Sequence, residues 1–203
     1  MIKISKRIVI GVIAMNLVIC SFTACGSKGK GAVSAVVEQP KGTVAVTLNY
    51  KERDSYYTNQ FAIWIEDDTG HFVKTVYVTS FTANGGYKKR EDALPIWVER
   101  SDIQTASSEA IDAISGPTPK SGKLMYIWDL TDEKGQAVAA GTYHFYVEAT
   151  VYQENRILYS GVINTNDPDT TATADASYTT DMAKDEATVT GVAATWKCKC
   201  FKR

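Results

Sequence analysis

Residues 111–122 read IDAISGPTPKSG, and this segment holds the side chains best suited to covalent chemistry. Ser115 and Thr118 carry hydroxyls, and Gly116 stands between them. The segment therefore raises the question of whether Thr118 is presented so that a group can be attached to it. The alternative is a Gly-Pro turn that leads the chain into a strand starting at Lys123, because loop hydroxyls are common and acceptors are rare.

The histidines and carboxylates outside this segment form no recognisable catalytic pattern. His71 falls at a predicted hairpin, and His144 alternates with apolar residues and therefore faces solvent. Asp67 and Glu148 lie close to them and are expected to cap turns or to solvate a strand face. We predict no catalytic residue and no enzymatic activity.

Metal ligands and structural cysteines are equally scarce. Cys198 and Cys200 lie at the extreme C-terminus, where a frayed tail with incidental thiols is expected. The alternatives are a strained, reducible Cys-x-Cys bridge and a pair of thiolates for a metal, but two thiols with two histidines make a poor zinc site. The oxygens of Asn166, Asp167 and Asp169 match no calcium loop with defined spacing. We expect no metal site and no disulfide framework.

The N-terminus reads as a targeting segment. Lys3, Lys6 and Arg7 precede an apolar run over residues 8–20, which is short for a membrane-spanning helix of about 20 residues. The sequence FTAC, ending at Cys25, resembles a bacterial lipobox, with a phenylalanine where leucine is usual. This predicts a lipoprotein signal peptide over residues 1–24 and lipidation of Cys25. An ordinary signal cleaved after Ala24 and an uncleaved anchor stay open.

Residues 25–40 are rich in glycine, serine and lysine, which is typical of a flexible tether, and a folded domain is expected over residues 41–203. Without the three basic residues of the signal, the 22 basic residues become 19 against 23 acidic ones, a formal charge of −4. An acidic domain lacks the basic field that nucleic acid requires. We therefore expect no nucleic-acid partner, a membrane contact through the lipid, and an envelope protein partner.

The folded part is predicted to be an all-β, antiparallel immunoglobulin-like sandwich of about seven strands. Alternating apolar residues mark strands over residues 43–50, 61–67, 71–81, 123–130, 142–152, 156–163 and 187–198. Val147 is expected to face the core. Residues 82–122 form a long insertion with a short helix, and residues 164–186 are expected to be a polar excursion.

Aromatic side chains are abundant around the first hairpin and the insertion. Trp64, Tyr77, Tyr87 and Trp97 lie there, and such residues suit the rim of a binding surface. A second core layer beneath the insertion would explain them equally well.

Residues 126–151 resemble the immunoglobulin-like domain of flagellar hook-capping proteins. The shared pattern is a Trp-Asp pair, a second acid, a turn glycine and a Gly-x-Tyr that opens a strand; here these residues are Trp128, Asp129, Asp132, Gly135, Gly141 and Tyr143. Leu130 stands where that pattern often has glycine. The resemblance implies a structural turn motif and carries no function.

Over residues 43–163 the chain resembles domain-of-unknown-function family 2271. That resemblance implies an extracytoplasmic location, genes that tend to lie near those of flavin transferases and other envelope redox proteins, and no established activity. DAISGPT resembles the flavin-attachment motif Asp-x-x-Ser-Gly-Ala-Thr, matched here by Asp112, Ser115, Gly116 and Thr118, with Pro117 in place of alanine. We therefore expect a lipid-anchored binding or assembly module that is attached to an envelope flavin or redox system, has an envelope protein partner and carries no cofactor. The alternative is a covalent FMN carrier modified at Thr118.

Overall fold

A computed structural model describes residues 42–54 and 57–199 of the 203-residue chain. The signal peptide, the tether, Cys25 and Cys200 lie outside these residues. Within the described part of the chain, no helix is long and apolar enough to cross a membrane.

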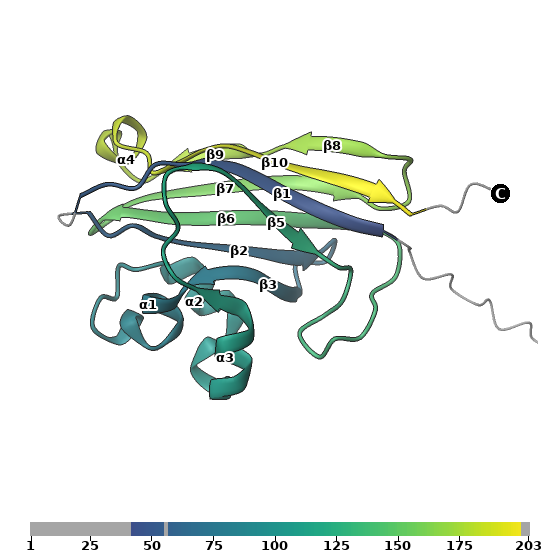
Figure 1. Cartoon of the computed structure of the whole chain (residues 1–203), viewed down its shortest axis with the longest axis horizontal. Helices are drawn as coiled ribbons and strands as arrows, with labels where there is room; N and C mark the ends of the chain where they lie inside the picture. Colours follow the sequence, from purple (N-terminus) through teal and green to yellow (C-terminus); the bar gives the residue numbers. More distant parts are fainter. Residues whose placement is uncertain (1–41, 55–56, 200–203) are drawn as a thin grey trace, which may run out of the picture. The chain divides into compact units, whose positions relative to one another are not determined.

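Two sheets stack face to face, which confirms the expected all-β sandwich (Figure 1). The first sheet has the order β5 (Gly122–Trp128), β1 (Gly42–Tyr50), β10 (Val189–Cys198) and β8 (Thr170–Thr173). The second has the order β4 (Ser115–Gly116), β3 (Phe72–Thr79), β2 (Gln60–Asp67), β6 (Thr142–Tyr152), β7 (Asn155–Asn164) and β9 (Asp175–Tyr178). Neighbouring strands are antiparallel except β3 and β4, which pair in parallel over two residues.

The main core lies between the sheets, where side-chain alternation places it. Val44, Val46 and Leu48 of β1 are buried, and they share one apolar cluster with Phe145 and Val147 of β6. Because successive side chains of a strand point to opposite faces, one residue in two faces this core. The expected inward position of Val147 is confirmed.

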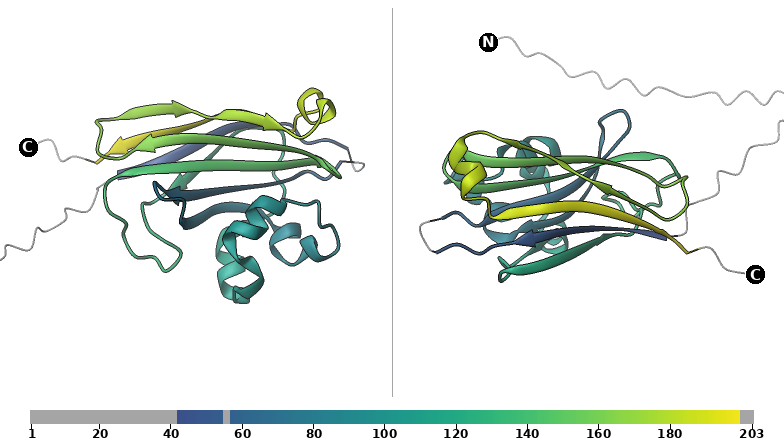
Figure 2. Two further views of the ribbon diagram at one scale, coloured as in Figure 1. Left: turned by 180° about the vertical axis from the view of Figure 1, so that it is seen from behind. Right: turned by 90° about the horizontal axis from the view of Figure 1, so that it is seen from above.

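The insertion after β3 contains more helix than the single short one expected. It forms α1 (Ser80–Ala83), α2 (Pro95–Ser101) and α3 (Ser108–Ile114), with 3-10 turns η1 (Gly86–Lys88) and η2 (Ile103–Thr105) between them. These elements lie on the outer side of the second sheet, the side that faces away from β1 (Figures 1 and 2).

A second apolar core fills the space between the insertion and the sheet. Its centre is Trp64 of β2 and Trp97 of α2, both essentially inaccessible to solvent, with Leu94 and Ile103 beside them and Tyr87 partly buried against them. Of the two interpretations of these aromatic residues, the second core layer is therefore correct for the tryptophans, and the exposed binding rim is wrong.

Residues 164–186 are not the polar excursion that was expected. They include β8, β9 and α4 (Asp181–Asp185), and the two short strands extend the edges of both sheets, which brings the described strands to ten instead of about seven. An edge strand needs only one backbone neighbour and can therefore be polar on both faces. Cys198 does not lie in the frayed tail that was expected, because it belongs to β10 and is disulfide-bonded.

The Trp-Asp motif forms a compact turn between β5 and β6. The Asp129 carboxylate accepts hydrogen bonds from the backbone N–H and the hydroxyl of Thr131, and Asp132 accepts from the N–H groups of Lys134 and Gln136. Gly135 has φ +73°, which favours glycine, and Leu130 adopts φ +60° with its side chain buried. The remaining motif residues close the structure: Trp128 Nε1 donates to Thr131 O, the Gly141 N–H donates to Thr165 Oγ1, and the Tyr143 hydroxyl donates to Ala139 O.

Candidate functional site

Helix α2 is fixed to the outer face of the second sheet by a buried glutamate. The N-terminal N–H groups of a helix lack partners within the helix, and the residue before α2, Leu94, offers no side-chain cap. Glu148 of β6 supplies the acceptors instead, at 2.8 Å from the N–H of Trp97 and 3.3 Å from that of Ile96. Burial raises the pKa of this fully inaccessible carboxyl to about 7, although the two backbone N–H groups and Arg156 favour its charged form.

Two further buried polar contacts hold the same helix. Glu66 of β2 accepts from Trp64 Nε1 at 2.9 Å and from Arg100 Nη1 at 2.9 Å, so its buried carboxylate has a charged partner on α2. Trp97 Nε1 donates to the Thr75 hydroxyl at 3.1 Å. The first half of the insertion, which ends with α2, is therefore held firmly on the sheet, because each buried polar atom of these contacts has a hydrogen-bond partner.

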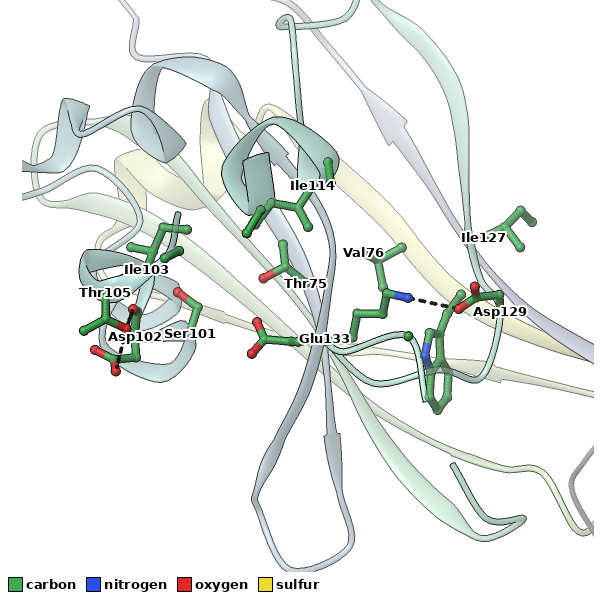
Figure 3. A pocket seen from close by; sticks show the side chains of 16 residues that line it. Thr75, Val76, Ser101, Asp102, Ile103, Thr105, Ile114, Ile127, Asp129 and Glu133 are labelled. Atoms are coloured by element: carbon green, nitrogen blue, oxygen red, sulfur yellow. Dashed lines mark hydrogen bonds and ion pairs between the residues drawn. The ribbon is translucent and has the colours of Figure 1, made fainter. Parts of the chain in front are cut away.

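The second half of the insertion, which consists of η2 and α3, covers a cavity of about 590 Å³ and is called its roof below (Figure 3). One wall comes from Lys74, Thr75 and Val76 of β3, and another from β5 and the residue after it, through Ile127, Trp128 and Asp129. Because adjacent side chains of a strand alternate, three consecutive residues can line one cavity only where it opens onto the edge of the strand. The cavity therefore lies between the β5 edge of the first sheet and the partly paired β3 edge of the second.

Small residues of α3 leave space for the cavity beneath the helix. Ala110, Ala113 and Ile114 lie on one face of the helix, at spacings of three and four, and all three line the cavity. Ser107 caps the helix by accepting from the Ala110 N–H at 3.3 Å. No residue of α3 is buried, so this roof is held far more loosely than α2.

Two carboxylates from different elements mark one end of the cavity. Asp102 ends α2 with φ +47° and accepts from the Thr105 hydroxyl at 3.1 Å, and Glu133 comes from the turn after β5. Partial burial and the nearby carboxylates of Asp132 and Asp102 raise the pKa of Glu133. A cation at this end would remove that repulsion.

The remaining polar groups of the cavity differ in whether they have partners. Lys74 Nζ contacts Asp129 at 3.1 Å and also Thr131, which neutralises the third carboxylate of the lining. The Ser101 hydroxyl, in contrast, is buried and has no hydrogen-bond partner among the described residues. Figure 3 shows Ser101 and Asp102 on one side of the cavity, with Glu133 between them and Asp129. One end of the cavity is thus acidic, and much of the rest is apolar.

The residues of the flavin-like motif lie beside this cavity and do not line it. Asp112 is on the exposed side of α3, Ser115 and Gly116 form β4, and Thr118 is partly exposed in the following loop. The Tyr77 hydroxyl donates to Pro117 O at 2.7 Å and fixes that loop. A Cβ on Gly116 would come within 2.8 Å of the Tyr77 ring, so a close approach already accounts for the glycine.

Sequence reasoning missed the residues that line the cavity and those that hold α2 on the sheet beside it. Glu148 was expected to solvate a face or cap a turn, and that expectation of solvation is wrong, because the insertion covers its face of the sheet. His144 and His71 stay outside the site, one on the outer face of β6 and the other exposed at the first hairpin. Within the described residues, no cluster of three or more metal-ligating side chains occurs.

A family model described as "Predicted periplasmic protein (DUF2271)" matches residues 41–183, which extend from just before β1 into α4. No curated protein and no solved structure matches the chain.

Proposed function

The chain belongs to the DUF2271 family of predicted periplasmic proteins, and we propose that it is a binding module of the cell envelope, held at the membrane by a lipid on Cys25. A periplasmic address agrees with the basic and apolar N-terminus that precedes the domain. The proposal assigns the domain no chemistry of its own.

The observation that carries the binding role is the cavity between the two sheet edges. Its volume of about 590 Å³ falls within the range of roughly 300–1,000 Å³ that is usual for ligand sites. Apolar walls with a few converging polar groups are the ordinary composition of such sites. The buried contacts of Glu148, Glu66 and Thr75 hold α2 beside the cavity, so one side of it is preformed.

A photo-crosslinking experiment in cells tests the binding role. A photoreactive amino acid replaces Ile127 in the cavity wall or, as a control, Val162 on the outer face of β7; the two side chains are 48% and 49% exposed. We expect discrete adducts from position 127 that disappear when Ala113→Trp fills the cavity, and none from position 162. Adducts of equal yield at both positions, or adducts that survive Ala113→Trp, would contradict a binding cavity.

Lipid anchoring has an independent test. Cys25→Ala removes the thiol that would carry the lipid, so we expect an unprocessed precursor without label after growth with a radioactive fatty acid. Cys20→Ala, which changes a cysteine inside the apolar run, is the matched control and is expected to be processed normally. Normal processing of the Cys25→Ala protein would refute the anchor.

A covalent FMN carrier is the second candidate function. The loop after β4 presents Thr118 partly exposed, and no hydrogen bond of its hydroxyl occurs among the described residues, so the oxygen is free to form a phosphoester. Against it, Pro117 places a rigid ring beside the acceptor. The motif otherwise matches at Asp112, Ser115 and Gly116.

Co-expression with a flavin transferase distinguishes the two candidates. A carrier gives a fluorescent band in a denaturing gel that Thr118→Ala eliminates, that Ser115→Ala weakens and that Pro117→Ala strengthens. We expect no band from the wild-type protein, because the proline restricts closure of the transferase over the loop. A strong wild-type band would make this domain an electron carrier.

A further inference from the structure

The edge of β3 that faces the cavity is only partly paired. At one end, the carbonyl of Val73 accepts from the Glu133 N–H at 3.1 Å, and at the other end Val78 and Thr79 pair with β4. Between these ends, residues 74–77 have β2 on one side and no described strand on the other. An open strand edge of this kind exposes backbone donors and acceptors to a further strand.

The unpaired edge of residues 74–77 has a definite length and a definite set of side chains around it. Four residues of strand span about 13 Å at roughly 3.3 Å per residue. Apolar side chains of Ile103, Ile114 and Ile127 line the cavity over this stretch, and Asp102 and Glu133 lie at its acidic end. Lys74 is the one basic residue of the lining, and it is neutralised by Asp129.

We propose that the cavity binds an extended peptide segment of another protein, which adds as a strand to the β3 edge in line with β4 and places a lysine or arginine between Asp102 and Glu133. This inference rests on the binding role proposed above and names the class of its partner. The buried, unpartnered hydroxyl of Ser101 would provide an additional polar contact at the same end.

A peptide fits these observations better than a small amine does. A small amine would use the two carboxylates and leave the strand edge unpaired, whereas an extended chain satisfies both features at once. The short β4 already shows how a segment lies along this edge, because Ser115 and Gly116 pair in parallel with Val78 and Thr79. Alternation along the peptide would direct every second side chain toward the apolar roof.

Defined peptide pools test this proposal on the soluble domain of residues 41–203. The pools are acetylated and amidated pentapeptides with lysine, glutamate or alanine at the centre, and with valine, threonine, alanine or serine at the other four positions. We expect the lysine pool to bind about tenfold more tightly than the glutamate pool, because the two carboxylates attract one and repel the other. In NMR spectra, the amide signals of residues 74–77 should shift and those of β7 should not.

Two matched changes separate the strand addition from the charge contact. N-methylation of the backbone beside the central lysine removes hydrogen-bond donors and should weaken binding at least tenfold if the peptide pairs with β3. The double variant Asp102→Asn and Glu133→Gln should abolish the preference for lysine while binding of the alanine pool persists. Both residues are largely exposed, so the variant is expected to fold normally.

The outcomes distinguish this inference from the proposed function. Absence of binding by the lysine pool, equal binding of the N-methylated pool, or equal binding of butylamine and the peptide would overturn the peptide assignment, even where position 127 still gives adducts in cells. Loss of both the peptide binding and the adducts would overturn the binding role as well. Self-association of the domain that competes with the pool would identify a second copy as the occupant and also refute the proposal.

Discussion

The two halves of the insertion are attached to the same sheet in different ways. Helix α2 has a fully buried tryptophan, Trp97, and its N-terminus contacts the buried carboxyl of Glu148. Near its end, the half-exposed Arg100 pairs with the buried carboxylate of Glu66. Helix α3 has the same length of seven residues, no buried residue and an exposed N-cap. Local stability follows buried contacts, so the first half should open only with the domain and the second half should open by itself.

This difference indicates a division of labour. The sheet and α2 make a stiff frame, and α3 with η2 makes an adjustable roof over the cavity. Binding elements are commonly drawn from the less stable parts of a fold, since they must admit a ligand. The following predictions test whether the division is real.

The largest effect is expected from Trp97→Ala. Removal of this inaccessible side chain leaves a cavity in the second core and deprives the Thr75 hydroxyl of its donor, which should cost about 3–5 kcal/mol of unfolding free energy. Ile114→Ala on α3 is the matched control and should cost less than about 1.5 kcal/mol, because its side chain is only partly buried. Urea denaturation measures both values, and equal losses would show that the two halves are equally anchored.

The second prediction concerns pH and Glu148. The folded-state pKa of about 7 lies above the usual value of 4.5, so the folded protein retains a proton that the unfolded chain loses. Stability from this group is therefore present below about pH 4.5 and is lost as the pH rises to about 7. The loss should amount to about 3 kcal/mol.

Comparison with Glu148→Gln isolates this contribution, since glutamine does not titrate. The unfolding free energy of the wild-type protein, after subtraction of that of the variant, should fall between pH 4.5 and 7 and level off above. Arg156 and the N–H groups of Ile96 and Trp97 act against this shift. A pH-independent difference would mean that they hold the carboxylate charged throughout.

The contrast between the halves also explains what the sequence could predict. The alternation in β1 and β6 identifies the main core, because that signal is local to each strand. The same alternation places Glu148 on the outer face of β6, which is correct. However, no sequence feature near Glu148 indicates that residues 94–97 cover that face. A polar residue on a covered face cannot be distinguished from one on a solvated face without the tertiary structure.

The cavity was beyond prediction for the same reason. Its lining comes from β3, from β5 and the turn after it, and from residues 101–114, which meet only after both sheets have formed. The only local indication was the pair Ala110 and Ala113, which lie three residues apart on a short helix and whose small side chains leave space on that helix face. Residues 170–178 were missed because edge strands do not require an apolar face.

The smallest effect, and the sharpest test of the comparison, is expected from Ser107→Ala. The Ser107 hydroxyl accepts from the Ala110 N–H, so its loss should destabilise α3 locally by about 1 kcal/mol. Because α3 is not buried, this change should leave the global free energy of unfolding almost unchanged. Hydrogen exchange at the amides of residues 111–114 should become about fivefold faster, which is the rate equivalent of about 1 kcal/mol.

The amides of Val98–Ser101 on α2 provide the internal reference, since their exchange should not change in the same variant. Thr180→Ala is the cap variant elsewhere, because the Thr180 hydroxyl accepts from the Ala183 N–H of α4 and also donates to Asn155 Oδ1 of β7. It should accelerate exchange in α4 and beside Asn155, and not in α3. If Ser107→Ala instead lowers the global stability or accelerates exchange in α2, both halves of the insertion open together, and the roof is not an independent element above a fixed frame.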